Sequence, residues 1–219
     1  MSKIYSVQDL SYKINNRKII EEVTCNIEEG ITVIKGPNGA GKTTFLKLLF
    51  GMIHPTSGNI VRHFNSKNIE ISYVFQEPIF LNRSVEDNLK HLLYCKSIKK
   101  NDWVKIIHHI VSEYSLEHLL KSQIKDLSGG ELQLLSLIRS IITKPSILLY
   151  DEPTNNLDDD NIELVSKIIN DINNQGLSLI MVSHNSILDN ITKYNQLFIK
   201  DGSLICLLYT SDAADDLWC

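Results

Sequence analysis

The chain has 219 residues, of which 43% are hydrophobic, and its 22 basic and 26 acidic residues give a formal net charge of −4. This length allows one sizeable core, or one domain with a small insertion. The charge lacks the basic excess that favours nucleic-acid binding, and no apolar run approaches the roughly 18 residues that cross a bilayer. The N-terminus also lacks a secretion signal. We therefore expect a cytoplasmic protein that reaches a membrane only through a partner.

The first motif along the chain is a glycine-rich loop. Residues 32–34 are predicted to end a buried strand and residues 44–50 to form an amphipathic helix, and GPNGAGKTT between them fits the pattern G-x-x-x-x-G-K-[ST]. Its glycines let successive N–H groups point at one anion, which the helix start also attracts. Lys42 is expected to reach the β- and γ-phosphates of a nucleotide, and the Thr43 hydroxyl to ligate Mg²⁺. The predicted phosphate-binding residues are Gly36, Pro37, Asn38, Gly39, Ala40, Gly41, Lys42, Thr43 and Thr44.

A helical segment is predicted for residues 84–126. Four apolar residues recur there at helical spacing, namely Trp103, Ile106, Ile107 and Ile110. Such a stripe usually packs into a core and does not form a binding surface. The segment is therefore expected to be a helical insertion with its own apolar face.

A second glycine-rich helix start follows. Residues 127–131 read LSGGE, and an apolar helix is predicted from there to about Thr143. Ser128, Gly129 and Gly130 can present a hydroxyl, backbone N–H groups and the positive end of a helix dipole to an anion. A serine cap before a flexible glycine pair explains the local structure, but such a pair costs helix stability. Since the motif has no lysine, it indicates half of a phosphate site, completed by another chain.

Two adjacent carboxylates follow a buried strand. Residues 147–150 are four consecutive apolar residues bounded by prolines, as expected of a strand buried on both faces of a parallel sheet. Asp151 is expected to lie behind the Mg²⁺ bound by Thr43, and Glu152 to face the γ-phosphate and polarise the attacking water. A solvated acidic turn is the alternative, but a buried strand rarely ends in two acids without a cation.

Taken together, these motifs resemble those of the nucleotide-binding subunit of an ABC transporter. The resemblance covers residues 3 to about 205 and depends on GPNGAGKTT, Gln76, LSGGE, ILLYDE, residues 156–158 and His184. It implies an α/β P-loop NTPase cassette: a RecA-like core with a mainly parallel sheet, an antiparallel N-terminal β-subdomain and an inserted α-helical subdomain. The implied ranges are 1–76 and 145–205 for the core and about 77–144 for the helical subdomain.

The resemblance also implies roles for single residues, with ATP and Mg²⁺ as cofactors. Tyr12 is expected to stack on adenine, with Tyr5 and a plain surface tyrosine as alternatives. Gln76 is expected to touch Mg²⁺ and the water and to hinge the helical subdomain. His184 is expected to hydrogen-bond the γ-phosphate, and Asp158 to communicate across a dimer interface.

The same resemblance implies partners. A second ATPase chain would sandwich two ATP molecules with this one, each phosphate loop facing the partner's LSGGE. A transmembrane permease would dock in the cleft beside Gln76 and hold the chain at the inner face of the membrane, and a substrate-binding protein is a further candidate partner. Residues 75–89 and 183–185 resemble the corresponding segments in bacterial oxyanion importers of the tungstate and phosphate types.

Two other functions stay open beside transport. One is a soluble ABC-type ATPase acting on ribosomes, DNA or metal-cluster assembly: translation-type relatives usually carry two cassettes and the chromosome-maintenance type a long coiled coil, and neither is found here. A small-molecule kinase would need neither LSGGE nor the Asp151–Glu152 pair. Transport is therefore the function that the motifs favour.

The C-terminal residues are set aside. Residues 206–215 read CLLYTSDAAD and look like translated sequencing adapter, so residues 206–219 are treated as a non-native tail. Leaving out the tail's three aspartates moves the net charge from −4 to about −1. Cys25 and Cys95 lack C-x-x-C spacing and indicate neither a disulfide nor a metal site. Leu132 and Leu134, after LSGGE, are open to contact either a partner or the core.

Overall fold

The computed structural model describes residues 2–63, 70–153, 157–183 and 185–209. Its strands are β1 (Lys3–Ile14), β2 (Arg17–Glu28), β3 (Ile31–Lys35), β4 (Ser57–Arg62), β5 (Ile71–Val74), β6 (Ile147–Asp151), β7 (Ser178–Val182), β8 (Asn195–Lys200) and β9 (Ser203–Tyr209). Its α-helices are α1 (Lys42–Phe50), α2 (Val85–Cys95), α3 (Trp103–Glu113), α4 (Gly129–Ile141) and α5 (Asp159–Asn174). Short 3₁₀ helices are η1 (Lys100–Asp102), η2 (Glu117–Leu119), η3 (Ile124–Asp126) and η4 (Asn185–Asn190).

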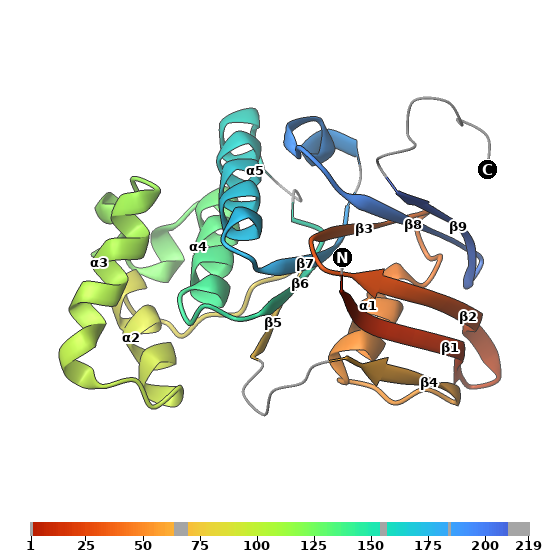
Figure 1. Cartoon of the computed structure of the whole chain (residues 1–219). Helices are drawn as coiled ribbons and strands as arrows, with labels where there is room; N and C mark the ends of the chain where they lie inside the picture. The colour runs from red at the N-terminus through yellow and green to blue at the C-terminus, as the bar shows by residue number, and fades with distance from the viewer. Residues whose placement is uncertain (1, 64–69, 154–156, 184, 210–219) are drawn as a thin grey trace.

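The strands form two sheets. A three-stranded antiparallel sheet has the order β2-β1-β4, and a six-stranded sheet has the order β5-β6-β7-β3-β8-β9. Neighbours in the larger sheet are parallel except β8 and β9. Figure 1 shows α2 and α3 at one end of the molecule and the three-stranded sheet at the other. The predicted fold class, a mainly parallel core sheet with an antiparallel N-terminal sheet and added helices, is confirmed.

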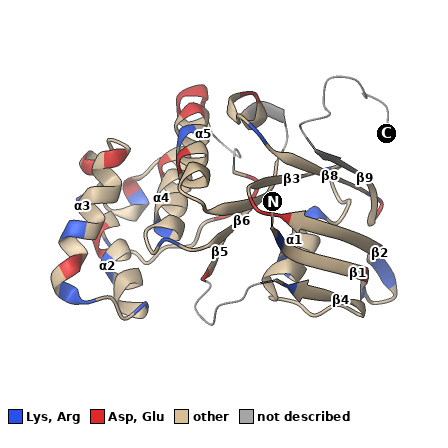
Figure 2. Ribbon diagram, viewed as in Figure 1, with Lys and Arg blue, Asp and Glu red and all other residues tan. Residues whose placement is uncertain are grey.

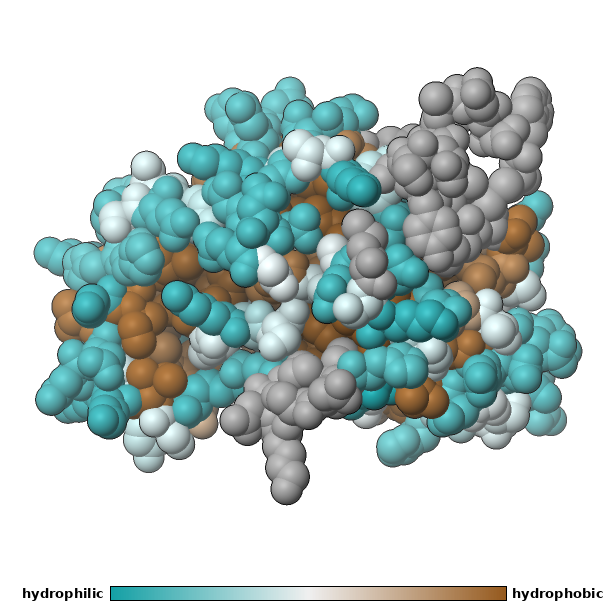
Figure 3. Space-filling model, in the orientation of Figure 1, coloured by the Kyte–Doolittle hydropathy of each residue, from teal (hydrophilic) through white to brown (hydrophobic). Residues whose placement is uncertain are grey.

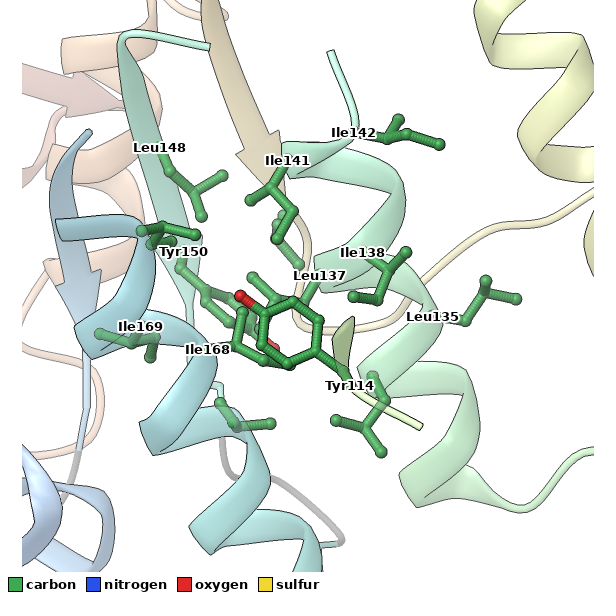
Figure 4. Packing of buried hydrophobic residues seen from close by; sticks show 14 of the residues in the cluster. Tyr114, Leu135, Leu137, Ile138, Ile141, Ile142, Leu148, Tyr150, Ile168 and Ile169 are labelled. Carbon is green, nitrogen blue, oxygen red and sulfur yellow. The ribbon is translucent and has the colours of Figure 1, made fainter. Parts of the chain in front are cut away.

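Strand β6 explains how the core is divided. Leu148 and Tyr150 point into an apolar cluster with α4 and α5, whereas Ile147 and Leu149 point into a second cluster with α1 and the three-stranded sheet. Figure 4 shows Tyr150 packed with Leu137 of α4 and Ile168 of α5. Because successive side chains of a strand face opposite ways, every residue of β6 is buried, as its apolar run predicts.

The structure of residues 84–126 agrees with the helical spacing of their apolar residues. Ser84 caps α2 by accepting a hydrogen bond from the Asp87 N–H at 3.1 Å. Ile107 of α3 is buried, and the other apolar residues of its stripe pack against the same cluster, so the stripe is core. Figure 2 shows basic and acidic residues interspersed along the α2 and α3 ribbons. The α1 and α4 helices each differ from their predicted ends by two residues, starting at Lys42 and ending at Ile141.

Strand β9 reaches Tyr209, past the expected domain end at residue 205, because its backbone continues to pair with β8. Across the part of the chain that the structure describes, no helix combines the length and the hydrophobicity that crossing a bilayer requires.

Helix α4 answers for Leu134, but not for Leu132, the open question of what the residues after LSGGE contact. Leu134 is buried in the core and Leu132 is half-buried. Gln133 between them is buried as well, and its Nε2 donates a hydrogen bond to the Tyr150 hydroxyl at 3.3 Å. The polar residue of this segment is therefore kept in the core by a partner on β6.

Replacing Tyr150 by Phe should lower the free energy of unfolding by about 1–3 kcal/mol, because the buried Gln133 amide loses its acceptor. The double variant Tyr150→Phe/Gln133→Leu should recover most of that loss, since no buried polar group then lacks a partner. Chemical denaturation of the wild type, both single variants and the double variant measures this. Strictly additive losses would contradict the pairing.

Candidate functional site

The phosphate loop lies between β3 and α1, and its shape depends on glycine. Gly36 has φ 145°, and a Cβ placed there would lie 1.9 Å from the carbonyl oxygen of Ile199 on β8. Any other residue would push the loop away from the sheet. Gly41 has φ 99° and forms the cap at which α1 begins. The loop thus turns tightly and directs the N-terminus of α1 toward the space above the sheet.

The lysine of the loop is held inside it. Lys42 is only 5% exposed, and its Nζ donates hydrogen bonds to the carbonyl oxygens of Gly36 and Pro37, both at 2.9 Å. This places a positive charge at the centre of the loop, beside the N–H groups of the first turn of α1. The arrangement suits the binding of an anion with several oxygen atoms.

A buried carboxylate lies next to the loop. Asp151, at the end of β6, is only 3% exposed; its Oδ1 accepts a hydrogen bond from the Thr43 hydroxyl at 3.0 Å, and its Oδ2 accepts one from the Tyr73 hydroxyl at 3.2 Å. Burial raises the pKa of Asp151, and the bonds from Thr43 and Tyr73 oppose that rise.

The surroundings of Asp151 fit a hard divalent cation. Among the described residues no ion pair joins Asp151 to a basic side chain. A buried carboxylate needs a compensating charge, and a carboxylate beside a threonine hydroxyl supplies the oxygen ligands that Mg²⁺ prefers. Thr43 and Asp151 are therefore the residues that would hold such an ion.

The second carboxylate faces the cavity in front of the loop. Glu152 has φ 52°, which is unusual for a residue other than glycine, and its N–H donates to the Val182 carbonyl oxygen at 3.0 Å. Its Oε2 accepts a hydrogen bond from Gln76 Nε2 at 2.8 Å. The turn therefore separates the two acids: Asp151 points to Thr43, and Glu152 points to Gln76.

These groups line one cavity of about 520 Å³. Its lining comprises Ile19, Asn38, Gly39, Gly41, Lys42, Thr43, Thr44, Gln76 and Glu152. Residues from four distant parts of the sequence thus meet at one place. A cavity lined by a lysine, a helix N-terminus and a carboxylate can bind a phosphate chain and activate a water molecule beside it.

The LSGGE segment forms the start of α4. The Ser128 Oγ accepts from the Glu131 N–H at 3.2 Å, and the Glu131 carboxylate accepts from the Ser128 N–H at 2.7 Å, which is a capping box. The backbone bond from Ser128 is the main cause that lowers the pKa of Glu131. Ser128 and Gly129 remain exposed. Among the described residues, the cavity that Ser128 lines shares none of its lining with the nucleotide cavity.

Three further predicted residues have different outcomes. Asp158 caps α5 by accepting from the Asn161 N–H at 2.9 Å, and the neighbouring Asp159 and Asp160 are exposed in the first helical turn. His184 lies outside the described residues, as does Asn156, the first residue of the stretch that ends in Asp158. The structure therefore shows Asp158 as a helix cap, and the hydrogen bond of His184 to the γ-phosphate stays a prediction.

The two tyrosines considered for stacking on adenine lie in different environments. Tyr12 is half-buried against the second core cluster, paired with Ile20 across β1 and β2, and is not among the described residues that line the cavity. Its stacking on adenine stays a prediction. The alternative, Tyr5, is wrong for that role because its side chain is fully buried.

Two residues of the site carry no sequence signal. Ile19 lines the cavity from β2, and its carbonyl oxygen lies against Gly41, but an isoleucine in a strand has no motif. Tyr73 precedes Gln76 by three residues, and only the folded sheet brings its hydroxyl to Asp151. Both are contributed by strands that reach the loop through tertiary packing.

Comparisons with known proteins agree on one family. The family model described as "ABC transporter" matches residues 20–155. The lipoprotein-releasing system ATP-binding protein LolD of Buchnera aphidicola subsp. Acyrthosiphon pisum is 33% identical over 199 residues, covering 84% of this chain and 85% of the relative. The zinc import ATP-binding protein ZnuC of Wigglesworthia glossinidia brevipalpis is 31% identical over 209 residues, covering 94% and 86%.

Solved structures show the same fold. CbiO1 of Clostridium perfringens, part of the transporter complex CbiONQ, superposes with a TM-score of 0.84 at 22% identity, covering 97% of this chain and 90% of that one. A nucleotide-free ATP-binding cassette from an ABC transporter superposes with a TM-score of 0.80 at 20% identity, covering 98% and 96%.

The Tyr73 hydrogen bond yields a pH prediction. Protons compete with Mg²⁺ for the Asp151 carboxylate as the pH falls, and the Tyr73 hydroxyl lowers the pKa of that carboxyl. Tyr73→Phe should therefore shift the acid limb of Mg²⁺-dependent hydrolysis upward by about half to one pH unit. Hydrolysis rates measured across pH at several Mg²⁺ concentrations test this. Tyr114→Phe, a buried tyrosine away from the cavity, is the control, and an unmoved limb in Tyr73→Phe would refute the role.

Proposed function

The chain belongs to the ABC transporter family, and from that premise we propose how its residues divide the work of an ATP-hydrolysing subunit that powers a membrane transporter. The observation that carries the proposal is the meeting of Lys42, Thr43 and Glu152 around one cavity, with Asp151 hydrogen-bonded to Thr43 directly behind it. Each of the four supplies a different part of phosphoryl-transfer chemistry.

The nucleotide phosphates bind where the loop and α1 begin. Lys42 and the N–H groups of the first turn neutralise the β- and γ-phosphates. Thr43 and Asp151, with Gln76 nearby, would hold Mg²⁺, which would supply further charge stabilisation. Glu152 accepts a proton from the attacking water. His184 is proposed to hydrogen-bond the γ-phosphate, and Tyr12 to stack on adenine.

The exposed start of α4 completes the site of a partner chain. Ser128 and Gly129 are open to solvent, and the capping box fixes the N-terminal turn in a helical geometry that can receive an anion. Since this turn does not line the chain's own nucleotide cavity, two chains bind head to tail with ATP between each phosphate loop and the partner's LSGGE. Asp158 is proposed to communicate across the same interface.

A permease docks on the helical side. Ile79 is 79% exposed and lines a cleft of about 390 Å³, to which β5, α2 and α4 also contribute residues. Figure 3 shows hydrophobic surface over this end of the molecule. Arg139 of α4 holds the cleft's edge, with Nη1 donating to the Ile79 carbonyl oxygen at 2.7 Å and the guanidinium 4.3 Å from the centre of the Phe80 ring. The exposed Ile79 side chain, on a loop that Arg139 holds in place, therefore suits contact with an apolar segment of a permease.

The names of the relatives bear on the transported substrate. Zinc import and lipoprotein release both occur in the names of relatives, so those names span different cargoes. We propose a bacterial solute importer held at the inner face of the membrane by its permease, with a substrate-binding protein as its further partner. The oxyanion type expected from residues 75–89 stays a prediction.

Two substitutions test the shared site. Glu152→Gln should lower turnover at least about 100-fold while an ATP-bound dimer accumulates, because binding survives and the general base is lost. Ser128→Arg should leave ATP binding to the single chain intact and block the dimer. Light scattering with ATP and Mg²⁺, together with phosphate release, measures both.

Lys42→Ala is the control for those two variants, since it should weaken ATP binding itself. Near-normal hydrolysis by Glu152→Gln would remove that residue from its role. A Ser128→Arg protein that dimerises normally would refute the head-to-tail arrangement.

The docking surface has a matched pair of variants. Ile79→Asp should reduce retention of the chain in the membrane fraction of expressing cells, whereas Val104→Asp, at an equally apolar position on α3 that is 57% exposed, should not. Both should keep ATP hydrolysis by the purified chain. Equal retention of the two variants would contradict docking at Ile79, and co-sedimentation of the wild type with ribosomes would favour the soluble alternative.

A further inference from the structure

We propose that His91 and Cys95 form a binding site for a borderline-soft divalent cation of the Zn²⁺ class on the surface of α2. The pair lies in the cleft described above, and neither residue lines the nucleotide cavity. The site is therefore separate from the groups that hold Mg²⁺ and ATP.

The helical spacing brings the two side chains together. Residues four apart on an α-helix lie on the same face, one turn above the other. Both His91 and Cys95 are exposed, so neither is needed to fill the core. An imidazole and a thiol are thus presented side by side to solvent at the edge of a cavity of about 390 Å³.

The distance between the donor atoms matches a shared metal ion. The Cys95 Sγ and the His91 Nε2 are 3.7 Å apart. Zn²⁺ binds thiolate sulfur at about 2.3 Å and imidazole nitrogen at about 2.0–2.1 Å, so two such ligands at a tetrahedral angle lie about 3.6 Å from each other. The separation of the two donor atoms is therefore compatible with chelation of one ion.

The ligand types select the class of ion. Sulfur and imidazole nitrogen favour Zn²⁺ and neighbouring transition metals, whereas Mg²⁺ and Ca²⁺ prefer oxygen. The described residues contain no group of three or more acidic, histidine or cysteine side chains arranged around one point, so water completes the coordination. Two protein ligands predict an exchangeable ion and not a permanent structural one.

Neighbouring charges are engaged elsewhere. The Lys96 ammonium, next to Cys95 in sequence, lies 2.7 Å from Glu70 Oε1, and the Arg139 guanidinium binds the Ile79 carbonyl oxygen. Each of these cations is therefore held by its own acceptor on the wall of the cleft, which leaves the outer side of the His91–Cys95 pair open to an incoming ion.

Titration of the full chain with Zn²⁺ by calorimetry tests the site, in a background where Cys206 and Cys219 are replaced by Ser so that the tail offers no thiol. Cys25 is buried and does not compete. We expect one Zn²⁺ per chain, and each of His91→Ala and Cys95→Ser should weaken binding at least about tenfold. His108→Ala, an exposed histidine on α3, is the control and should bind as the background does.

Co²⁺ provides a second measurement, because a thiolate ligand gives a sulfur-to-cobalt charge-transfer band that Cys95→Ser should abolish. Unchanged Zn²⁺ affinity in both variants, or saturable binding without that band, would overturn the proposal and leave the 3.7 Å contact as a local side-chain contact within α2. Far-UV circular dichroism checks that the variants stay folded. Neither measurement needs a permease, so failure here is distinguishable from failure of the docking proposal.

Discussion

The hydrogen bond between Thr43 and Asp151 is the contact on which the site depends, because it joins the two halves of the chemistry. Thr43 is in the first turn of α1, and Asp151 ends a strand more than 100 residues later, 3.0 Å away. Asp151 is held there because every residue of β6 is buried on one face of the sheet or the other. A shift in the packing of β6 would thus move a metal ligand relative to the phosphate loop.

The same strand also explains why two adjacent acids do different work. Asp151 is still in the sheet, so its side chain points to Thr43 and Tyr73. Glu152 leaves the sheet with φ 52°, which turns its carboxylate to Gln76 and the cavity. The backbone of one residue therefore separates the proposed metal ligand from the proposed general base, and the strain of that conformation is stored at the point where hydrolysis is expected.

Much of this architecture could be predicted from the sequence because it depends on local patterns. The phosphate loop needs glycines at fixed spacing, and β6 needs an unbroken apolar run, so both are visible in short windows. Ile19 and Tyr73 could not be found this way, since their roles arise when distant strands meet at the loop. For Tyr12 the sequence is informative about one contact and silent about another. Its spacing predicts a contact with adenine, but spacing does not reveal that the side chain packs partly against the second core cluster.

Helix α4 connects the surfaces that the function requires. Its first turn presents Ser128, and its last turn carries Arg139, which holds the loop at Ile79. Between these ends the helix is almost wholly buried, with Gln133 fixed to Tyr150 of β6. A helix packed this closely moves as one body, because bending it would open cavities on its buried face. In the proposed assembly, a displacement at the permease cleft would therefore reach the turn proposed to face the partner's nucleotide, and closure of that site would act back along the same helix.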